Sequence, residues 1–132
     1  DTFDLRRQVA QNQAQAMSDP LTGLPNRRAY EQRMQQEYAR WRRFGEPLAL
    51  VVWDVDNFKA INDSFGHKSG DKALAMIAKI LRARVRETDF VARYGGEEFV
   101  LIMTCSTLQD CLPVAEQLRA AQEGIRQLQQ PL

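Results

Sequence analysis

The stretch from Leu48 to Val55, LALVVWDV, decides the fold. It is almost continuously apolar, rich in β-branched residues and too short for a helix, so it predicts a buried, central β-strand. Asp54 and Asp56 lie at its far end. We therefore expect a sheet with carboxylates at the end of one strand.

A helix is expected before this strand. Large side chains recur there every three or four residues and share one helical face: Tyr30, Met34, Tyr38 and Trp41. The predicted helix runs from Arg27 to Phe44, with Asn26 as its N-cap and with Gly45 and Pro47 ending it. The segment 19–26, DPLTGLPN, holds two prolines and a glycine and predicts a turn.

A second helix and a hairpin are expected after the strand. The apolar residues of the helix follow helical spacing: Leu74, Ile77, Ala78, Leu81 and Val85. Two strands follow, Phe90–Tyr94 and Phe99–Thr104, and the Gly95–Gly96 pair between them accepts the positive φ of a tight turn. Glu97 and Glu98 are then expected at the tip of the hairpin.

A last helix is expected to begin near Asp110, because Pro113 is tolerated only in a first turn, and to end near Gly124. The residues that continue it are Leu112, Ala115, Leu118 and Arg119. The order helix, strand, helix, hairpin, helix predicts an α/β sandwich. Its helices would flank a mixed sheet of parallel and antiparallel pairs.

Residues 1–17 predict an N-terminal signalling or linker helix ahead of a domain that spans residues 18–132. Four positions have the 4-3-4 spacing of a coiled-coil seam: Leu5, Val9, Asn12 and Ala16. This spacing favours a dimerising helix. Because the seam is short and weakly apolar, a helix that packs on its own domain is the alternative.

Composition narrows the classes of function. The 132 residues hold 18 basic and 17 acidic side chains, so net charge favours neither a nucleic-acid polymer nor a membrane. Cys105 and Cys111 match no zinc or redox spacing, and we expect both to be free and buried. No stretch approaches the roughly 20 apolar residues of a membrane span. We expect a cytoplasmic chain, and leave open the membrane attachment of the parent protein.

The candidate chemical site combines Asp54-Val55-Asp56 with Glu97-Glu98. Carboxylates gathered at a strand end repel one another unless a cation shields them, and hard oxygen ligands select Mg²⁺ or Mn²⁺. The alternative is that Asp56 caps the next turn and the glutamates are merely solvated. The loop 58–71, rich in glycine, donors and acceptors, is suited to cradle phosphates or a base.

Four motifs closely resemble the GGDEF family of diguanylate cyclases: DPLTGLPNR at 19–27, DVDNFKAIND at 54–63, GHKSGD at 66–71 and RYGGEEF at 93–99. They stand in the family's order and the match covers roughly residues 18 to 120. The resemblance implies a fold similar to polymerase palms and adenylyl cyclases. It also implies a homodimer in which two GTP are condensed to cyclic di-GMP and pyrophosphate. The 3′-hydroxyl of each would attack an α-phosphate with the help of a metal ion.

The resemblance also implies roles for the acidic residues. Asp54, the Val55 carbonyl and Glu97 look like the metal ligands, with Mg²⁺ or Mn²⁺ as the ion. Glu97 is in addition the candidate acceptor of the hydroxyl proton, and Glu98 would assist a second metal.

Substrate and product contacts are implied in the same way. Lys59 resembles the lysine that meets the triphosphate, together with backbone groups of Asn57 and Phe58. Asn62 and Asp71 resemble the pair that reads guanine, and His67 lies beside them. Surface solvation is the alternative for Lys59, and a loop histidine that bonds backbone is the alternative for His67.

Arg86 and Asp89 stand in the place of the family's inhibitory motif, which binds the product cyclic di-GMP. The resemblance therefore implies product feedback. A pair with this spacing is also common at helix ends as a cap or a surface salt bridge, which is the alternative explanation.

The sequence departs from the family pattern after the last helix. Family members continue with a strand, a helix and a phosphate-binding lysine and arginine, whereas this chain stops at IRQLQQPL, residues 125–132. We expect an exposed sheet edge and reduced turnover in this shortened form. The alternatives are a noncatalytic module that binds GTP or cyclic di-GMP, and a dimerising signalling segment with a vestigial site. An upstream sensor domain is expected in the parent protein.

Overall fold

A computed structural model describes residues 1–55, 59, 63 and 66–128, with backbone alone for residues 9–15 and 125–128. The sheet consists of β1 (Leu48–Asp54), β2 (Phe90–Arg93) and β3 (Glu98–Thr104), in the order β1-β3-β2. Both pairings are antiparallel, so the parallel pairs of the predicted mixed sheet do not occur among the described strands. The expected sheet with flanking helices is confirmed.

The prediction that the LALVVWDV strand is central was wrong for the described sheet, where β3 holds the centre and β1 lies at an edge. The hairpin turns β3 back from β2 so that it lies between β2 and β1. Along β1, Ala49 is buried whereas Val52 is 64% exposed, so burial alternates although the sequence does not. The continuous apolar run predicted a strand buried on both faces, whereas one face of β1 is open.

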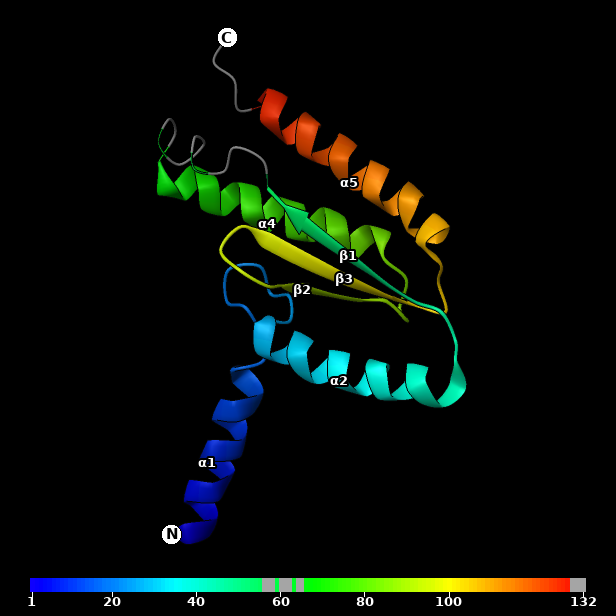
Figure 1. Cartoon of the computed structure of the whole chain (residues 1–132). Helices are drawn as coiled ribbons and strands as arrows, with labels where there is room; N and C mark the ends of the chain where they lie inside the picture. The colour runs from blue at the N-terminus through cyan, green and yellow to red at the C-terminus, as the bar shows by residue number, and fades with distance from the viewer. Residues whose placement is uncertain (56–58, 60–62, 64–65, 129–132) are drawn as a thin grey trace.

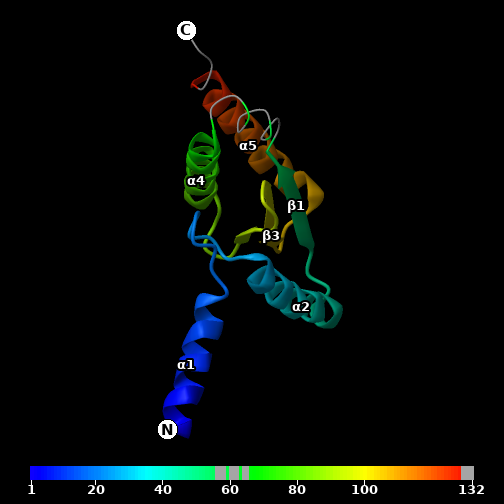
Figure 2. The same ribbon diagram turned by 90° about the vertical axis from the view of Figure 1, so that its left-hand side faces the viewer.

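Helices cover both faces of the sheet (Figure 1, Figure 2). On one face lie α4 (His67–Arg84) and α5 (Leu108–Leu128), and α4 buries the apolar face that the sequence predicted. The core joins these helices to the sheet through Leu74, Ile77, Ala78 and Leu81 of α4, Cys111 and Leu118 of α5, and Phe99, Leu101 and Met103 of β3. This packing buries one face of β3, and the central place of β3 in the sheet completes its burial.

The helix α2 (Arg27–Phe44) packs on the other face beside β2, leaves the β1 part of that face open, and has the predicted bounds. Asn26 caps it by accepting from the Ala29 amide at 3.0 Å, and Gly45 ends it with φ 72°. The aromatic face is only partly covered, since Tyr38 and Trp41 are exposed. The buried residue of α2 is instead Glu37, whose carboxylate pairs with Arg33 at 3.0 Å and so tolerates burial.

The last helix, α5, begins at Leu108, near the predicted Asp110, but its predicted end was wrong, because it continues through Gly124. Asp110 accepts from the Thr107 amide at 2.7 Å and so fixes the first turn. Pro113 lies in the second turn, where it removes a backbone bond to the Gln109 carbonyl. Both residues are exposed, so water can satisfy that carbonyl.

The helix α1 (Thr2–Gln15) extends away from the sheet (Figure 1). The side chains of residues 1–8, including Phe3 and Leu5, are exposed, so this part of α1 does not pack on its own domain. No helix in the described part of the chain is both long and apolar enough to cross a bilayer.

Candidate functional site

Asp54 and Glu98 are directly opposite each other in the antiparallel pairing of β1 with β3. Side chains of directly opposed residues project from the same face of a sheet and lie close together. Next along the chain, the Val55 amide donates to the Glu97 carbonyl at 3.0 Å. The two acidic motifs, distant in sequence, thus meet at one end of the sheet.

The hairpin between β2 and β3 is fixed through three successive carbonyl groups. The Gly96 carbonyl accepts from the Arg93 guanidinium at 2.8 Å, and the Glu97 carbonyl accepts from Val55. The Glu98 carbonyl accepts from the amides of Tyr94 at 2.8 Å and Gly95 at 3.3 Å. The backbone that carries both glutamates is therefore held at every residue.

The predicted reason for the glycine pair was wrong, because neither Gly95 nor Gly96 has a positive φ. Space explains Gly95 instead. A Cβ at Gly95 would lie 3.3 Å from Glu98 Cδ, whereas a Cβ at Gly96 would meet nothing within 4 Å. Gly95 thus leaves room for the Glu98 side chain to fold back over the turn.

Asp19 and Arg93 belong to the same assembly, although sequence reasoning had not placed them in the site. Arg93 Nη1 lies 3.1 Å from Asp19 Oδ1, and both side chains are largely buried. The Arg93 amide also donates to the Pro25 carbonyl at 2.9 Å. The turn before α2 therefore anchors the hairpin. A D-x-x-T turn is visible in the sequence, but its partner is not.

The turn around Asp19 also determines the ionisation of that residue. Burial alone would raise the pKa of Asp19. Hydrogen bonds from the hydroxyl and amide of Thr22 and the charge of Arg93 outweigh burial and hold the pKa below its usual value. Asp19 is thus a stable anion opposite Arg93.

The donors at this end of the sheet are carboxylate and carbonyl oxygens, which suit a hard divalent cation. Among the described residues, no group of three or more His, Cys, Asp or Glu side chains lies close enough to hold a metal ion. Mg²⁺ usually takes only one or two protein carboxylates and completes its shell with water and substrate phosphates. A site made of Asp54 and a glutamate of the hairpin fits that requirement.

The other predicted site residues are only partly within the described chain. Lys59 is exposed, as are His67 at the start of α4 and Asp71 four residues later. Gly66 precedes α4 with φ 87°, a backbone conformation that favours glycine. Asp56, Asn57, Phe58 and Asn62 lie outside the described residues.

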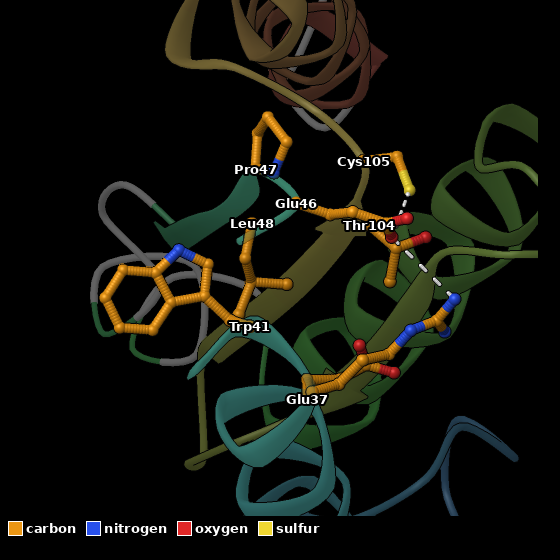
Figure 3. A pocket seen from close by; sticks show the side chains of 8 residues that line it. Glu37, Trp41, Glu46, Pro47, Leu48, Thr104 and Cys105 are labelled. Carbon is orange, nitrogen blue, oxygen red and sulfur yellow. Dashed lines mark hydrogen bonds and ion pairs between the residues drawn. The ribbon is translucent and has the colours of Figure 1, made fainter. Parts of the chain in front are cut away.

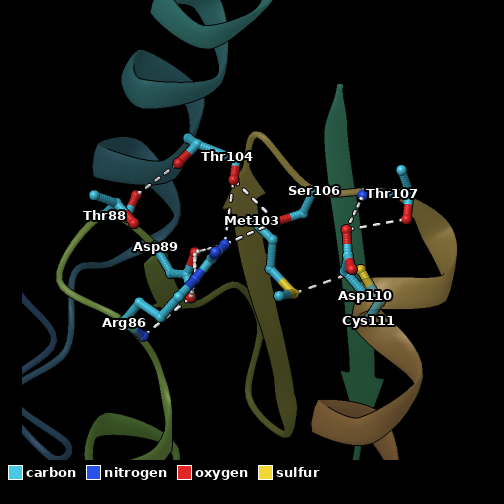
Figure 4. Close-up of polar contacts among 9 residues, drawn as sticks. All are labelled: Arg86, Thr88, Asp89, Met103, Thr104, Ser106, Thr107, Asp110 and Cys111. Atoms are coloured by element: carbon cyan, nitrogen blue, oxygen red, sulfur yellow. Dashed lines mark hydrogen bonds and ion pairs between the residues drawn. The ribbon is translucent and has the colours of Figure 1, made fainter. Parts of the chain in front are cut away.

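Arg86 and Asp89 form a bidentate ion pair at the start of β2 (Figure 4), with a shortest distance of 2.8 Å. The Asp89 side chain is 2% exposed and that of Arg86 53%. Arg86 also donates to Ser106 Oγ at 2.7 Å and to the Thr104 carbonyl at 3.2 Å. The hydrogen bond with Asp89 raises the pKa of Arg86. The pair therefore ties the end of α4 to the segment before α5.

A hollow at the opposite end of the sheet lies between α2 and β1 (Figure 3). Leu48 and Thr104 line this hollow and are directly opposite each other in the pairing of β1 with β3. Leu48 and Asp54 are the two ends of the seven-residue strand β1. Cys105 at its rim donates to Glu46 Oε2 at 3.2 Å, and this bond raises the pKa of the thiol. Both cysteines are free, but the prediction that Cys105 is buried was wrong.

Comparison with known proteins identifies the architecture around the acidic pair. A family model described as "Diguanylate cyclase, GGDEF domain" matches residues 16–131. The chain belongs to the GGDEF family. The resemblance seen in the motifs is thereby confirmed.

Individual relatives agree with the GGDEF assignment. Diguanylate cyclase DgcP of Pseudomonas aeruginosa is 54% identical over 106 residues, which are 80% of this chain and 16% of that protein. The crystal structure of diguanylate cyclase SiaD with its activator SiaC, from the same species, gives a TM-score of 0.76 at 41% identity. It covers 91% of this chain and 48% of that one.

A GGDEF domain of DgcB from Caulobacter crescentus, solved in complex with c-di-GMP, gives a TM-score of 0.77 at 33% identity. That match covers 80% of this chain and 60% of that one. The matched part of the chain spans 16% of the length of DgcP and 36% of the length of a diguanylate cyclase of Vibrio cholerae.

Proposed function

We propose that this GGDEF domain condenses two GTP molecules into cyclic di-GMP and pyrophosphate. The observation that carries the proposal is the register of β1 and β3, which sets Asp54 opposite Glu98 beside an anchored GGEE turn. Carboxylates opposed in this way repel each other unless a cation lies between them. The relatives' activity supports the same reaction.

Asp54, the Val55 carbonyl and Glu97 would hold the divalent ion, Mg²⁺ or Mn²⁺, and Glu98 would assist a second ion. Such an ion, when bound, neutralises charge that develops on phosphate oxygens. The hydrogen bonds on the Gly96, Glu97 and Glu98 carbonyls keep these side chains at one end of the sheet. Their arrangement before substrate arrives reduces the reorganisation that the reaction requires.

In the proposed reaction, the ribose 3′-oxygen of one GTP forms a bond to the α-phosphorus of the other. The bond from that phosphorus to the bridging oxygen breaks, and pyrophosphate leaves. Glu97 accepts the hydroxyl proton. In a second step of the same kind, the 3′-oxygen of the other GTP bonds to the α-phosphorus of the first. A second pyrophosphate leaves and the ring is closed.

Substrate contacts follow the motif positions. Lys59, with backbone groups of Asn57 and Phe58, would bind the triphosphate, since an ammonium group suits phosphate oxygens. Asn62 and Asp71 would read guanine through an amide and a carboxylate, with His67 nearby. The exposure of Lys59, His67 and Asp71 is compatible with contact to a ligand from solvent.

A homodimer is part of the proposal, because each half-site holds one GTP and supplies one attacking hydroxyl. The exposed Phe3 and Leu5 of α1 support a role for this helix in pairing two chains. An upstream sensor domain in the parent protein would act through α1.

Product feedback is proposed at Arg86 and Asp89. The Arg86 side chain is half-exposed although it is bonded to Asp89, so it can still meet a phosphate of cyclic di-GMP. Asp89, being buried, would orient the arginine rather than contact the ligand.

The test is a mass-spectrometric assay for cyclic di-GMP with GTP and Mg²⁺, which compares the chain with Glu97→Ala. We expect product from the unchanged chain and at least about a hundredfold less from the variant. If the unchanged chain binds GTP but forms no product, the noncatalytic binding module becomes the better description.

A further inference from the structure

The Tyr94 ring, immediately before the glycine pair, is bracketed by two side chains from the first turn of α2. The Tyr30 ring meets it edge to face, with centroids 5.5 Å apart and an interplanar angle of 87°. The Arg27 guanidinium carbon lies 4.6 Å from the Tyr94 ring centroid. Both geometries are attractive, the first between ring edge and face and the second between cation and π-face.

The backbone at Tyr94 transmits this contact to the glutamates. The Tyr94 amide donates to the Glu98 carbonyl at 2.8 Å, so the two residues close the base of the turn. Gly95 and Gly96 have no side chains with which to hold the turn, and glycine is conformationally free. Side-chain anchoring of this segment therefore depends on the residues before the pair, Arg93 and Tyr94.

The start of α2, which carries Arg27 and Tyr30, is itself held by hydrogen bonds. The Asn26 side chain accepts from the Ala29 amide and donates to the Ala16 carbonyl, and the Asn26 amide donates to the Met17 carbonyl at 3.0 Å. Arg27 is held over the ring by Glu31 at 3.1 Å. Burial raises the pKa of Tyr30, and the neighbouring Tyr94 and Glu31 raise it further, so its phenol stays neutral.

We propose that Arg27 and Tyr30 are positioning residues that hold the Glu97 and Glu98 carboxylates in place by clamping the Tyr94 ring. The inference rests on the proposed function, since it assigns these residues to the same nucleotide site. The Arg27 side chain is 60% exposed, so it adds little to the core. Its position over Tyr94 therefore serves the hairpin more than the fold.

The test measures amide hydrogen exchange by NMR at Tyr94, Gly95 and Val55, whose amides bond the Glu98 and Glu97 carbonyls. Tyr30→Leu removes the edge-to-face contact and is expected to speed exchange at these amides about tenfold. Arg27→Gln is expected to speed it about threefold. Exchange at Leu101, in the middle of β3, should not change, and Tyr30→Phe should restore the protected state.

Matched controls lie on the same helix. Tyr38→Leu removes an exposed ring that lies at a tilt to Trp41, with ring centroids 5.9 Å apart. Arg28→Gln removes the exposed neighbour of Arg27. Neither control should alter exchange at the three amides.

A second readout is the affinity for GTP with Mg²⁺ by calorimetry, which we expect Tyr30→Leu to weaken about tenfold and Tyr30→Phe to retain. Unchanged exchange in Tyr30→Leu, equal acceleration at Leu101, or faster exchange without weaker GTP binding would each overturn the inference. If the unchanged chain binds no GTP, the proposed function fails. The exchange data alone then decide whether the contacts of Arg27 and Tyr30 with Tyr94 hold the turn between β2 and β3.

Discussion

Asp19 and Arg93 form an ion pair at 3.1 Å although they are 74 positions apart in the chain. The same guanidinium donates to the Gly96 carbonyl at 2.8 Å. One arginine therefore connects the turn before α2 with the loop that carries the glutamates. The position of the acidic site depends on this long-range contact as much as on the strands.

Replacing Asp19 should destabilise the fold. Asp19→Asn leaves the Arg93 guanidinium with weaker partners in a largely buried place, and we expect a loss of about 2 kcal/mol in the free energy of unfolding. Urea denaturation measures it. The control is Glu116→Gln, which breaks an exposed pair with Arg119 and should cause no measurable loss. A loss in the control equal to that in Asp19→Asn would contradict the burial argument.

The pH dependence of stability should change with Asp19. Its pKa is lowered by folding, so its contribution is present above the pKa of an unfolded aspartate, about 4, and is lost as pH falls through the lower folded value. The stabilities of the unchanged chain and Asp19→Asn should therefore converge as pH falls below about 4. Parallel curves down to the acid limit would show that Asp19 does not titrate in this way.

The two hairpin glycines should respond differently to alanine. Gly95→Ala places a Cβ 3.3 Å from Glu98 Cδ, so the carboxylate must shift by a few tenths of an ångström. We expect turnover to fall about tenfold with little change in Tm. Gly96→Ala meets no atom within 4 Å and should retain more activity. Equal losses in the two variants would show that space around Glu98 is not the reason for Gly95.

The acidic pair should reduce stability in the absence of a divalent ion. Because Asp54 and Glu98 are like charges directly opposite on neighbouring strands, Asp54→Asn should stabilise the metal-free chain by about 0.5 kcal/mol. Added Mn²⁺ should raise the Tm of the unchanged chain more than that of the variant. Thermal unfolding with and without Mn²⁺ checks both; a variant less stable than the unchanged chain in metal-free buffer would argue against repulsion.

Local signals in the sequence predicted much of this fold. Asn26 and Gly45 marked both ends of α2, because capping and left-handed backbone depend on residues close in sequence. The acidic ends of β1 and of the hairpin were recognised from residue type and position. That the two acidic motifs lie side by side follows only from the pairing of β1 with β3, which places Asp54 opposite Glu98.

Features that depend on distant contacts were not predictable. The open face of β1 follows from where α2 lies, and the sequence LALVVWDV does not encode that placement. Burial of Glu37 depends on its pair with Arg33, and the partner of Asp19 is set by tertiary structure. Gly95 was assigned to a turn conformation, whereas its reason is the nearby Glu98 side chain.

The most direct test is calorimetric titration of GTP in the presence of Mg²⁺ into the unchanged chain and into Asp54→Asn, with circular dichroism showing that both are folded. If the acidic residues hold the metal ion and GTP, the unchanged chain should bind GTP, and Asp54→Asn should bind it at least about tenfold more weakly. No binding by the folded chain, or equal affinity in the two, would contradict it.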